Sequence, residues 1–341
     1  MYFKKLSVSV IMITLTIISV IAFGIFGWAS AKDLTKPISL KFAANPEGTA
    51  WYLYGGTFGE VAFEGLRKGS RVDVLPGPGA VSNPVFVSQG KADIGITSSA
   101  LAQMAWNGKE LYSPKQYKNL RLITSLGDEY YLAIAVRKDT GITSLEDIVK
   151  KKHPLRLGTS VKTGGTYWDS LALLELYGIS EDKLRGWGGS ITPTSFSEVS
   201  QGIRDRRLDA IAWYCTRGHP GWTELAETAD ITFLSYSDEI IDKMISQRGL
   251  LDFTMPANCF KGQDRDIRYP GITTIWLASE AMPAELAYFL TKAFCENAES
   301  IRAAHAGLRN YYPEKLISEK KYAIPHHPGS EKYYREKGWV Q

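Results

Sequence analysis

The 341-residue sequence lacks the motifs from which most catalytic centres are built. It holds five histidines, and none of them forms an H-E-x-x-H zinc motif. There is no G-x-S-x-G nucleophile turn, no Walker phosphate loop and no G-x-G-x-x-G dinucleotide fingerprint. We therefore expect a protein that is not an enzyme and that uses no cofactor and no metal ion.

Cysteine is also scarce. The three cysteines, Cys215, Cys259 and Cys295, lie far apart and form no C-x-x-C pair. An odd number leaves at least one thiol outside any disulfide. We expect all three to be small apolar residues packed inside the protein.

Charge of one sign is nowhere concentrated. The net charge is +4, and lysine and arginine are scattered among aspartate and glutamate. Without a basic block or a regular track of stacking aromatics, we expect no nucleic-acid partner. A hydrophobic content of 44% and a charged content of 22% are typical of a globular protein, and the length suits two domains.

Only one long apolar run occurs, and it lies at the N-terminus. Lys4 and Lys5 precede an uncharged stretch at 6–30, and Ala29-Ser30-Ala31 matches the small-x-small pattern of signal peptidase. We interpret residues 1–31 as a cleaved export signal, with an uncleaved membrane anchor as the alternative. Either interpretation places the rest of the chain outside the cytoplasmic membrane. It is then free in the periplasm, or it is tethered to the membrane if the signal is not cleaved.

Two glycine-threonine loops recur in matching contexts, at residues 46–52 and 162–168. Each loop follows a short apolar run and precedes a helix-like stretch. Farther along, at a similar spacing, comes a basic residue, a spacer and an aspartate that open an apolar strand, at 91–96 and at 207–212. This duplication predicts two lobes built on one plan, each pointing a helix N-terminus at a shared cleft.

Alternating strands, loops and helices predict an α/β fold with largely parallel sheets. We expect the chain to cross into the second lobe near Tyr130–Arg137 and to return near Gly271–Ala278, which permits hinge closure around a ligand. The expected division is a discontinuous first lobe, residues 32–136 and 271–341, and a second lobe, residues 137–270. A long helix is predicted from Ala284 to about His305, and the segment from Pro313 is expected to wrap the first lobe.

The candidate ligand-binding residues lie at the predicted helix starts, at strand ends and at the first crossing. Backbone N–H groups at helix starts favour an anion, and an arginine can grip a carboxylate with two hydrogen bonds. The alternative for the threonines and serines is ordinary helix capping, and for Trp213 it is core packing. The candidates are Glu47, Gly48, Thr49, Tyr52, Ser98, Ser99, Tyr130, Lys162, Thr163, Gly164, Gly165, Thr166, Trp213, Tyr214 and Arg217.

The charged candidates give competing indications of the ligand. Lys162 and Arg217 favour an organic acid, whereas Glu47 favours a solute with an ammonium group, such as an amino acid. A pair of neighbouring histidines, His326 and His327, is expected in an exposed tail rather than at a metal.

The order of these motifs resembles the TAXI-type receptors, the extracytoplasmic solute-binding proteins of TRAP transporters. Three further segments are similar to that family, at 262–266, 286–294 and 327–334. Two departures fall where a ligand is expected. The first loop carries Glu47 in place of a glycine, and the second loop is longer and adds Lys162.

The resemblance implies a two-lobed periplasmic-binding-protein fold of type II. It also implies capture of a small organic anion or amino acid and its delivery to TRAP membrane permease subunits. Two other functions remain open at this point. One is an enzyme on the same two-lobed scaffold, and the other is a periplasmic ligand sensor for a signalling partner.

Overall fold

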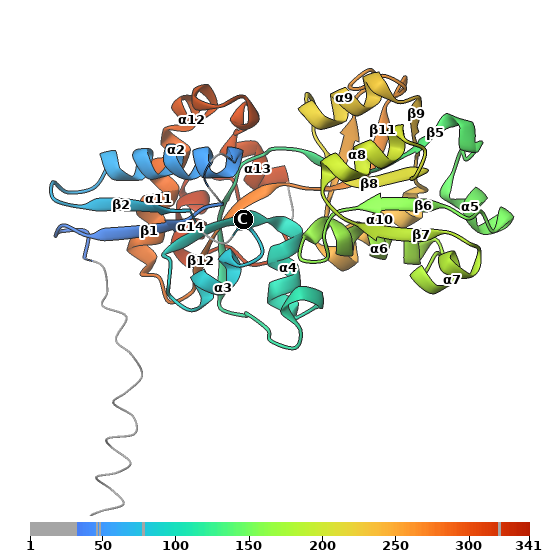
Figure 1. Cartoon of the computed structure of the whole chain (residues 1–341). Coiled ribbons are helices and arrows are strands. Elements are labelled where there is room, and N and C mark those ends of the chain that lie inside the picture. The colour runs from blue at the N-terminus through green and yellow to red at the C-terminus, as the bar shows by residue number, and fades with distance from the viewer. Residues whose placement is uncertain (1–32, 46, 48, 77–78, 320–321) are drawn as a thin grey trace, which may run out of the picture. The chain divides into compact units, whose positions relative to one another are not determined.

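The computed structural model describes residues 33–45, 47, 49–76, 79–319 and 322–341. Residues 34–341 form one compact unit, and this unit contains two β-sheets flanked by helices (Figure 1). The predicted export signal, residues 1–31, lies outside the described residues. The α/β architecture agrees with the fold class expected from the sequence. The expectation of largely parallel sheets is wrong, because six of the ten strand pairs in the described residues are antiparallel.

The first sheet has the strand order β2-β1-β3-β12-β4. β1 pairs in parallel with β2 and β3, and β12 runs antiparallel to both β3 and β4. Apolar side chains on these strands are buried because helices cover the sheet. The strands are β1 Ser39–Ala43, β2 Arg71–Leu75, β3 Ile94–Ser98, β4 Leu120–Ser125 and β12 Thr274–Ser279.

The second sheet follows the order β10-β11-β5-β8-β6-β7, with β9 also paired to β5. β6, β7 and β8 are mutually parallel, whereas β5 is antiparallel to β8, β9 and β11. The strands are β5 Tyr130–Arg137, β6 Arg156–Thr159, β7 Ser190–Pro193, β8 Ala210–Cys215, β9 Ile231–Phe233, β10 Leu251–Met255 and β11 Ile267–Ile272.

The helices connect the strands of both sheets. The predicted helix from Ala284 to about His305 is instead two helices, because Asn297 leaves helical geometry between them. The α-helices are α2 Ala50–Glu64, α3 Asn83–Ser88, α4 Ser99–Asn107, α5 Leu145–Lys151, α6 Gly165–Leu176, α7 Glu181–Gly186, α8 Phe196–Arg204, α9 Pro220–Thr228, α10 Asp238–Arg248, α11 Ala284–Glu296, α12 Ala298–Ala304, α13 Pro313–Glu319 and α14 Pro328–Glu336; the 3₁₀ helices are η1 Glu110–Tyr112, η2 Lys138–Thr140 and η3 Ala306–Leu308.

The two aspartates of the repeated motif hold equivalent places. Asp93, just before β3, accepts the backbone N–H of Lys41 in β1 at 2.7 Å and donates its own N–H to the Lys41 carbonyl at 2.9 Å. Asp209, just before β8, makes the same two bonds with Arg156 in β6, at 3.0 and 2.8 Å. Each aspartate therefore ties the end of one strand to its parallel neighbour, and the duplication predicted from the sequence is present in the fold.

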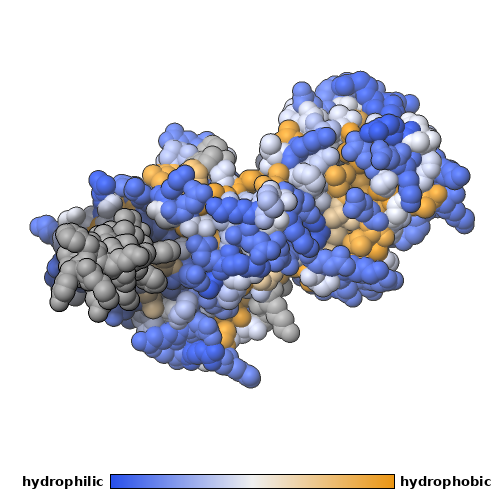
Figure 2. Space-filling view, turned by 90° about the horizontal axis from the view of Figure 1, so that it is seen from below, coloured by the Kyte–Doolittle hydropathy of each residue, from blue (hydrophilic) through white to orange (hydrophobic). Residues whose placement is uncertain are grey.

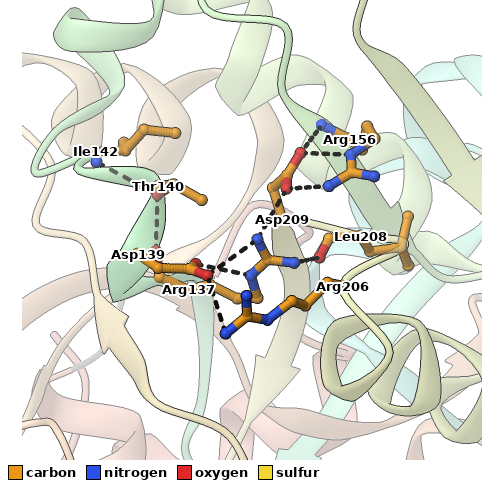
Figure 3. A network of polar contacts seen from close by, with 8 residues as sticks. All are labelled: Arg137, Asp139, Thr140, Ile142, Arg156, Arg206, Leu208 and Asp209. Atoms are coloured by element: carbon orange, nitrogen blue, oxygen red, sulfur yellow. Dashed lines mark hydrogen bonds and ion pairs between the residues drawn. The ribbon is translucent and has the colours of Figure 1, made fainter.

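Asp209 also anchors a small charged network (Figure 3). Its carboxylate lies between Arg156, at 2.6 Å, and Arg137, at 3.6 Å. Burial opposes ionisation of Asp209, but the hydrogen bonds from Arg156 outweigh it and lower the pKa of the carboxyl group. Since every member is bound to protein groups at the strand ends, the network stabilises the sheet.

Two link segments carry the chain between the sheets. Residues 126–129 join β4 of the first sheet to β5 of the second, and Thr273 alone joins β11 to β12. Asp128 connects the two links, because its buried carboxylate accepts hydrogen bonds from the Thr273 hydroxyl (2.9 Å) and the Thr274 backbone N–H (2.7 Å) and also from the Thr274 hydroxyl. The chain passes from one sheet to the other at these links. The expected lobe boundaries remain a prediction.

The C-terminal segment packs on the first sheet, as predicted. Pro325 and His327 exchange backbone hydrogen bonds with Leu122 in β4, and α14 lies against α11. The expectation of an exposed histidine pair is wrong. His327 is buried and its Nδ1 accepts the N–H of Gly329 at the start of α14, while His326 is half-buried beside Tyr334.

The visible surface in Figure 2 is mostly hydrophilic, and apolar residues show on it only in small groups. In the part of the chain that the structure describes, no helix has the length and apolar character needed to cross a membrane. All three cysteines are free; Cys215 and Cys295 are buried as expected, and Cys259 is half-buried.

Candidate functional site

Two cavities flank the strand pair formed by β5 and β11. Tyr130 faces Ile272 in this pair, and each of them lines one cavity. The first cavity has a volume of about 520 Å³ and the second about 420 Å³. The first is lined by Asn45, Trp51, Ala80, Val81, Ser82, Ser98, Leu101, Thr163, Gly164, Gly165, Thr166, Asp169, Tyr214 and Ile272.

The N-terminus of α6 opens into the first cavity. Gly164 occupies the cap position, and since glycine has no side chain, no side-chain oxygen accepts the first free N–H groups of this helix. The hydroxyl group of Thr166 makes no hydrogen bond to any residue that the structure describes. This wall therefore presents unoccupied donors and a partial positive charge, an arrangement that binds anions.

The opposite wall comes from helices next to the first sheet. Ser98 caps α4, and its hydroxyl accepts the N–H of Leu101 at 3.2 Å. An added Cβ on Gly165 would lie 3.2 Å from Leu101 Cδ2, so the first turns of α4 and α6 touch. The first cavity is thus bounded by the N-terminal ends of two helices. One is α4, which follows a strand of the first sheet, and the other is α6, which follows a strand of the second.

A buried ionic network lies next to this cavity. Asp169 in α6 is almost fully buried and accepts hydrogen bonds from Tyr214 Oη at 2.9 Å and from Arg248 Nε at 2.8 Å. Arg248, the last residue of α10, also binds Glu110 in η1 at 2.6 Å. Because Glu110 belongs to the segment between β3 and β4 and Arg248 to the segment between β9 and β10, this ion pair connects the chain around the two sheets.

The second cavity is more strongly charged. Its lining comes from the end of the first link and the start of β5 (128–131), from the loop after β8 and the start of α9 (216–220), and from the segment at 305–310. Ala50 and Tyr54 of α2 complete it. Arg217 lies 3.5 Å from Glu129 and 3.4 Å from the Tyr131 hydroxyl. Burial raises the pKa of Tyr54 and Tyr130, so both phenols stay protonated at neutral pH.

The structure brings most of the predicted residues to these cavities. Thr163, Gly164, Gly165, Thr166, Ser98 and Tyr214 line the first, and Tyr130 and Arg217 line the second. Whether these residues contact a ligand stays a prediction.

Six of the remaining candidates lie in the described chain, and none of the six lines either cavity. Glu47 is exposed, and Gly48 lies outside the described residues. Thr49 caps α2 through a hydrogen bond from the Tyr52 N–H, and Trp213 packs edge-on against Phe196, so the structural alternatives describe these residues best. The others are Tyr52, which packs on the first-sheet core, Ser99, which is buried beside the cap of α4, and Lys162, which is exposed above the Tyr167 ring.

Sequence reasoning missed several residues that line or support the first cavity. Trp51 lies between the candidates Thr49 and Tyr52, and its position in the first loop could have identified it. Asp169 follows Thr166 by one helical turn, so helical spacing places it on the same face. Arg248 carries no local signal, because only the packing of α10 on α6 brings it to Asp169.

The described residues contain no cluster of three or more histidine, cysteine or acidic side chains that could hold a metal ion. Cys215 is buried against Met255, and burial raises the pKa of its thiol far above the ordinary value, so it is not an activated nucleophile.

The solved structures with this fold include a solute-binding protein. The TctC solute-binding protein from Polaromonas is 15% identical, with a TM-score of 0.53, and the match covers 92% of this chain and 97% of that protein. MatC from Rhodopseudomonas palustris with bound malate is 11% identical, with a TM-score of 0.50, and covers 89% and 99%. At this identity the likeness shows the fold, and it confirms the expected two-lobed architecture of periplasmic binding proteins.

A family model supplies the closer relationship. The model of the NMT1-like family matches residues 42–338, which include both sheets and all but the ends of the described chain. The match begins inside β1 and ends just after α14. The protein therefore belongs to the NMT1-like family.

Proposed function

We propose that this protein is an extracytoplasmic solute receptor of the TAXI type that captures a small organic anion and delivers it to the membrane permease subunits of a TRAP transporter. The observation that carries the proposal is the α6 N-terminus, which opens without a side-chain cap into a cavity shared with the start of α4. Family membership and the order of the sequence motifs support the receptor class. A periplasmic location belongs to the same proposal.

The lining of the first cavity favours an organic acid over an amino acid. Glu47, which the sequence offered as the partner of an ammonium group, is exposed and lies outside the lining. Asp169 is the acidic residue among the described lining residues, and Arg248 and Tyr214 already occupy its oxygens. An ammonium group would therefore find no free carboxylate there, whereas a carboxylate would meet the donors of α6. MatC, the solved neighbour with malate, shows that the fold accommodates such an acid in another protein.

Thr166→Val tests the site. The change keeps the shape of the side chain and removes a hydroxyl group that lines the cavity, so the affinity for a bound carboxylate should fall by about 1–3 kcal/mol. Calorimetric titration of a panel of mono- and dicarboxylates against the native protein and the variant measures the loss.

Thr57→Val is the matched control, because the Thr57 hydroxyl lies on the exposed side of α2 and bonds to the Leu53 carbonyl. Its affinity should equal that of the native protein. Equal binding by the Thr166 variant, with a native far-UV spectrum, would show that the solute lies elsewhere and that the proposed site is wrong.

A further inference from the structure

Two arginine side chains, from segments far apart in the sequence, line the second cavity. Arg217 comes from the loop after β8, and Arg309 follows η3, which packs near α2. The Arg309 side chain is exposed and makes no ion pair or hydrogen bond within the described chain. Arg217 is held only by contacts of 3.4 and 3.5 Å, at the long end for a hydrogen bond.

Two histidines add further donors. His219 caps α9, and its Nδ1 accepts the N–H of Trp222 at 3.3 Å. His305 Nδ1 accepts the N–H of Gly307 at 2.9 Å. Since each Nδ1 is an acceptor, a neutral imidazole must carry its proton on Nε2. Both rings are therefore fixed in the tautomer that offers an Nε2–H donor.

The two acidic groups of this cavity already have partners within the described chain. Asp128 directs its carboxylate to Thr273 and Thr274. Glu129 accepts the Tyr131 hydroxyl at 2.7 Å and shares its charge with Arg217. Arg309 makes no ion pair with any residue that the structure describes, so its charge is available to a ligand.

We infer that the second cavity binds a doubly charged anion, a dicarboxylate or a phosphate, between Arg217 and Arg309. Such a ligand offers acceptors to both guanidinium groups, one on the loop after β8 and the other on the segment after η3. Among the described residues, this site shares no lining residue with the first cavity, so it goes beyond the proposed function and does not depend on it.

Calorimetry at low ionic strength tests the inference, with succinate, phosphate and acetate as probes. Succinate or phosphate should bind the native protein, and acetate should bind at least about tenfold more weakly because it has one acidic group. The better of the two dianions identifies the ligand class. Arg309→Gln and Arg217→Gln should each weaken the dianion about tenfold or more.

The controls separate local from general effects. Arg185→Gln in α7 removes the same charge from an exposed side chain that lies outside both cavities, and it should leave binding within about twofold. Thr166→Val should leave dianion binding in the second cavity unchanged. Circular dichroism confirms the fold of each variant.

Three results would overturn the inference. The first is the absence of succinate or phosphate binding at about 5 mM. The second is equal binding by Arg309→Gln and the Arg185 control. The third is loss of dianion binding in Thr166→Val but not in Arg309→Gln, because the anion would then lie in the first cavity.

Discussion

Asp128 carries a carboxylate into the interior at the point where the chain leaves the first sheet. Its three hydrogen bonds hold Thr273 and Thr274 in the return link. An acceptor at this position is therefore needed more than a charge. A carboxamide can keep one oxygen on the Thr274 N–H, whereas a methyl group leaves that N–H buried without a partner.

We expect Asp128→Ala to lower the free energy of unfolding by about 2–4 kcal/mol, and Asp128→Asn to lower it by less than about 1 kcal/mol. Urea unfolding of the three proteins at one pH measures both values. Equal losses in the two variants would show that the charge, and not the acceptor, matters at this position.

The stability of the native protein relative to Asp128→Asn should also depend on pH. Burial raises the pKa of Asp128, so between the ordinary and the raised value the folded state binds its proton more tightly than the unfolded chain. The stability from this group is fully present below the ordinary pKa and is lost as the pH rises through the folded pKa. The native protein should thus lose stability relative to Asp128→Asn as the pH rises above the ordinary pKa of an aspartate, about 4.

At the scale of elements, the contact between α4 and α6 has almost no spare room. A methyl group on Gly165 would lie 3.2 Å from Leu101 Cδ2, so the Leu101 side chain or one of the helix starts must move by a few tenths of an ångström. Gly165→Ala should speed amide hydrogen exchange in α4 by about tenfold, because overpacking costs about 1–3 kcal/mol.

Gly56→Ala is the matched control for this exchange experiment. Gly56 is also helical, and an added Cβ there meets nothing within 4 Å. Its exchange in α4 should equal that of the native protein. Native exchange rates in the Gly165 variant would mean that the contact between α4 and α6 is not maintained in solution.

Local pattern predicted the elements well and their contacts less well. Strand spacing and the aspartate motif identified the repeated plan, because both are set by neighbours in sequence. The break at Asn297 was missed, since apolar residues continue at helical spacing on both sides of it. Arg248 could not be placed at Asp169, because a salt bridge across distant elements leaves no trace in local spacing.

The same limit applies at the candidate site, where some predicted residues line a cavity and others do not. Glu47 and Gly164 both stand in glycine-threonine loops, yet Glu47 is exposed and Gly164 lines the first cavity. Thr49 and Gly164 begin equivalent helices, but the hydroxyl of Thr49 fills the position that glycine leaves open. Sequence alone indicates a helix start, and the side chain at the cap decides whether its donors are free.

For the whole molecule, the ion pair between Glu110 and Arg248 should favour the arrangement seen here. Both side chains are mostly buried, and Arg248 also binds Asp169. Glu110→Gln should cost about 1–3 kcal/mol and should increase the radius of gyration measured by small-angle scattering. Glu239→Gln, which breaks an exposed pair with Lys243 in the same helix α10, is the control and should change neither quantity. An unchanged radius in the Glu110 variant would contradict this role.

The position of β12 has a consequence for the order in which the protein can fold. β12 lies between β3 and β4 in the first sheet, yet the chain reaches it only after completing the strands of the second sheet. A nascent chain that ends before Thr274 therefore has β3 and β4 with no strand between them, and both present open edges. Because pairing over so long a sequence separation is slow, the N-terminal third of the molecule must wait for its partner. In the second sheet β5 also pairs with the late strand β11, but β8 and β9 reach it before β11 does.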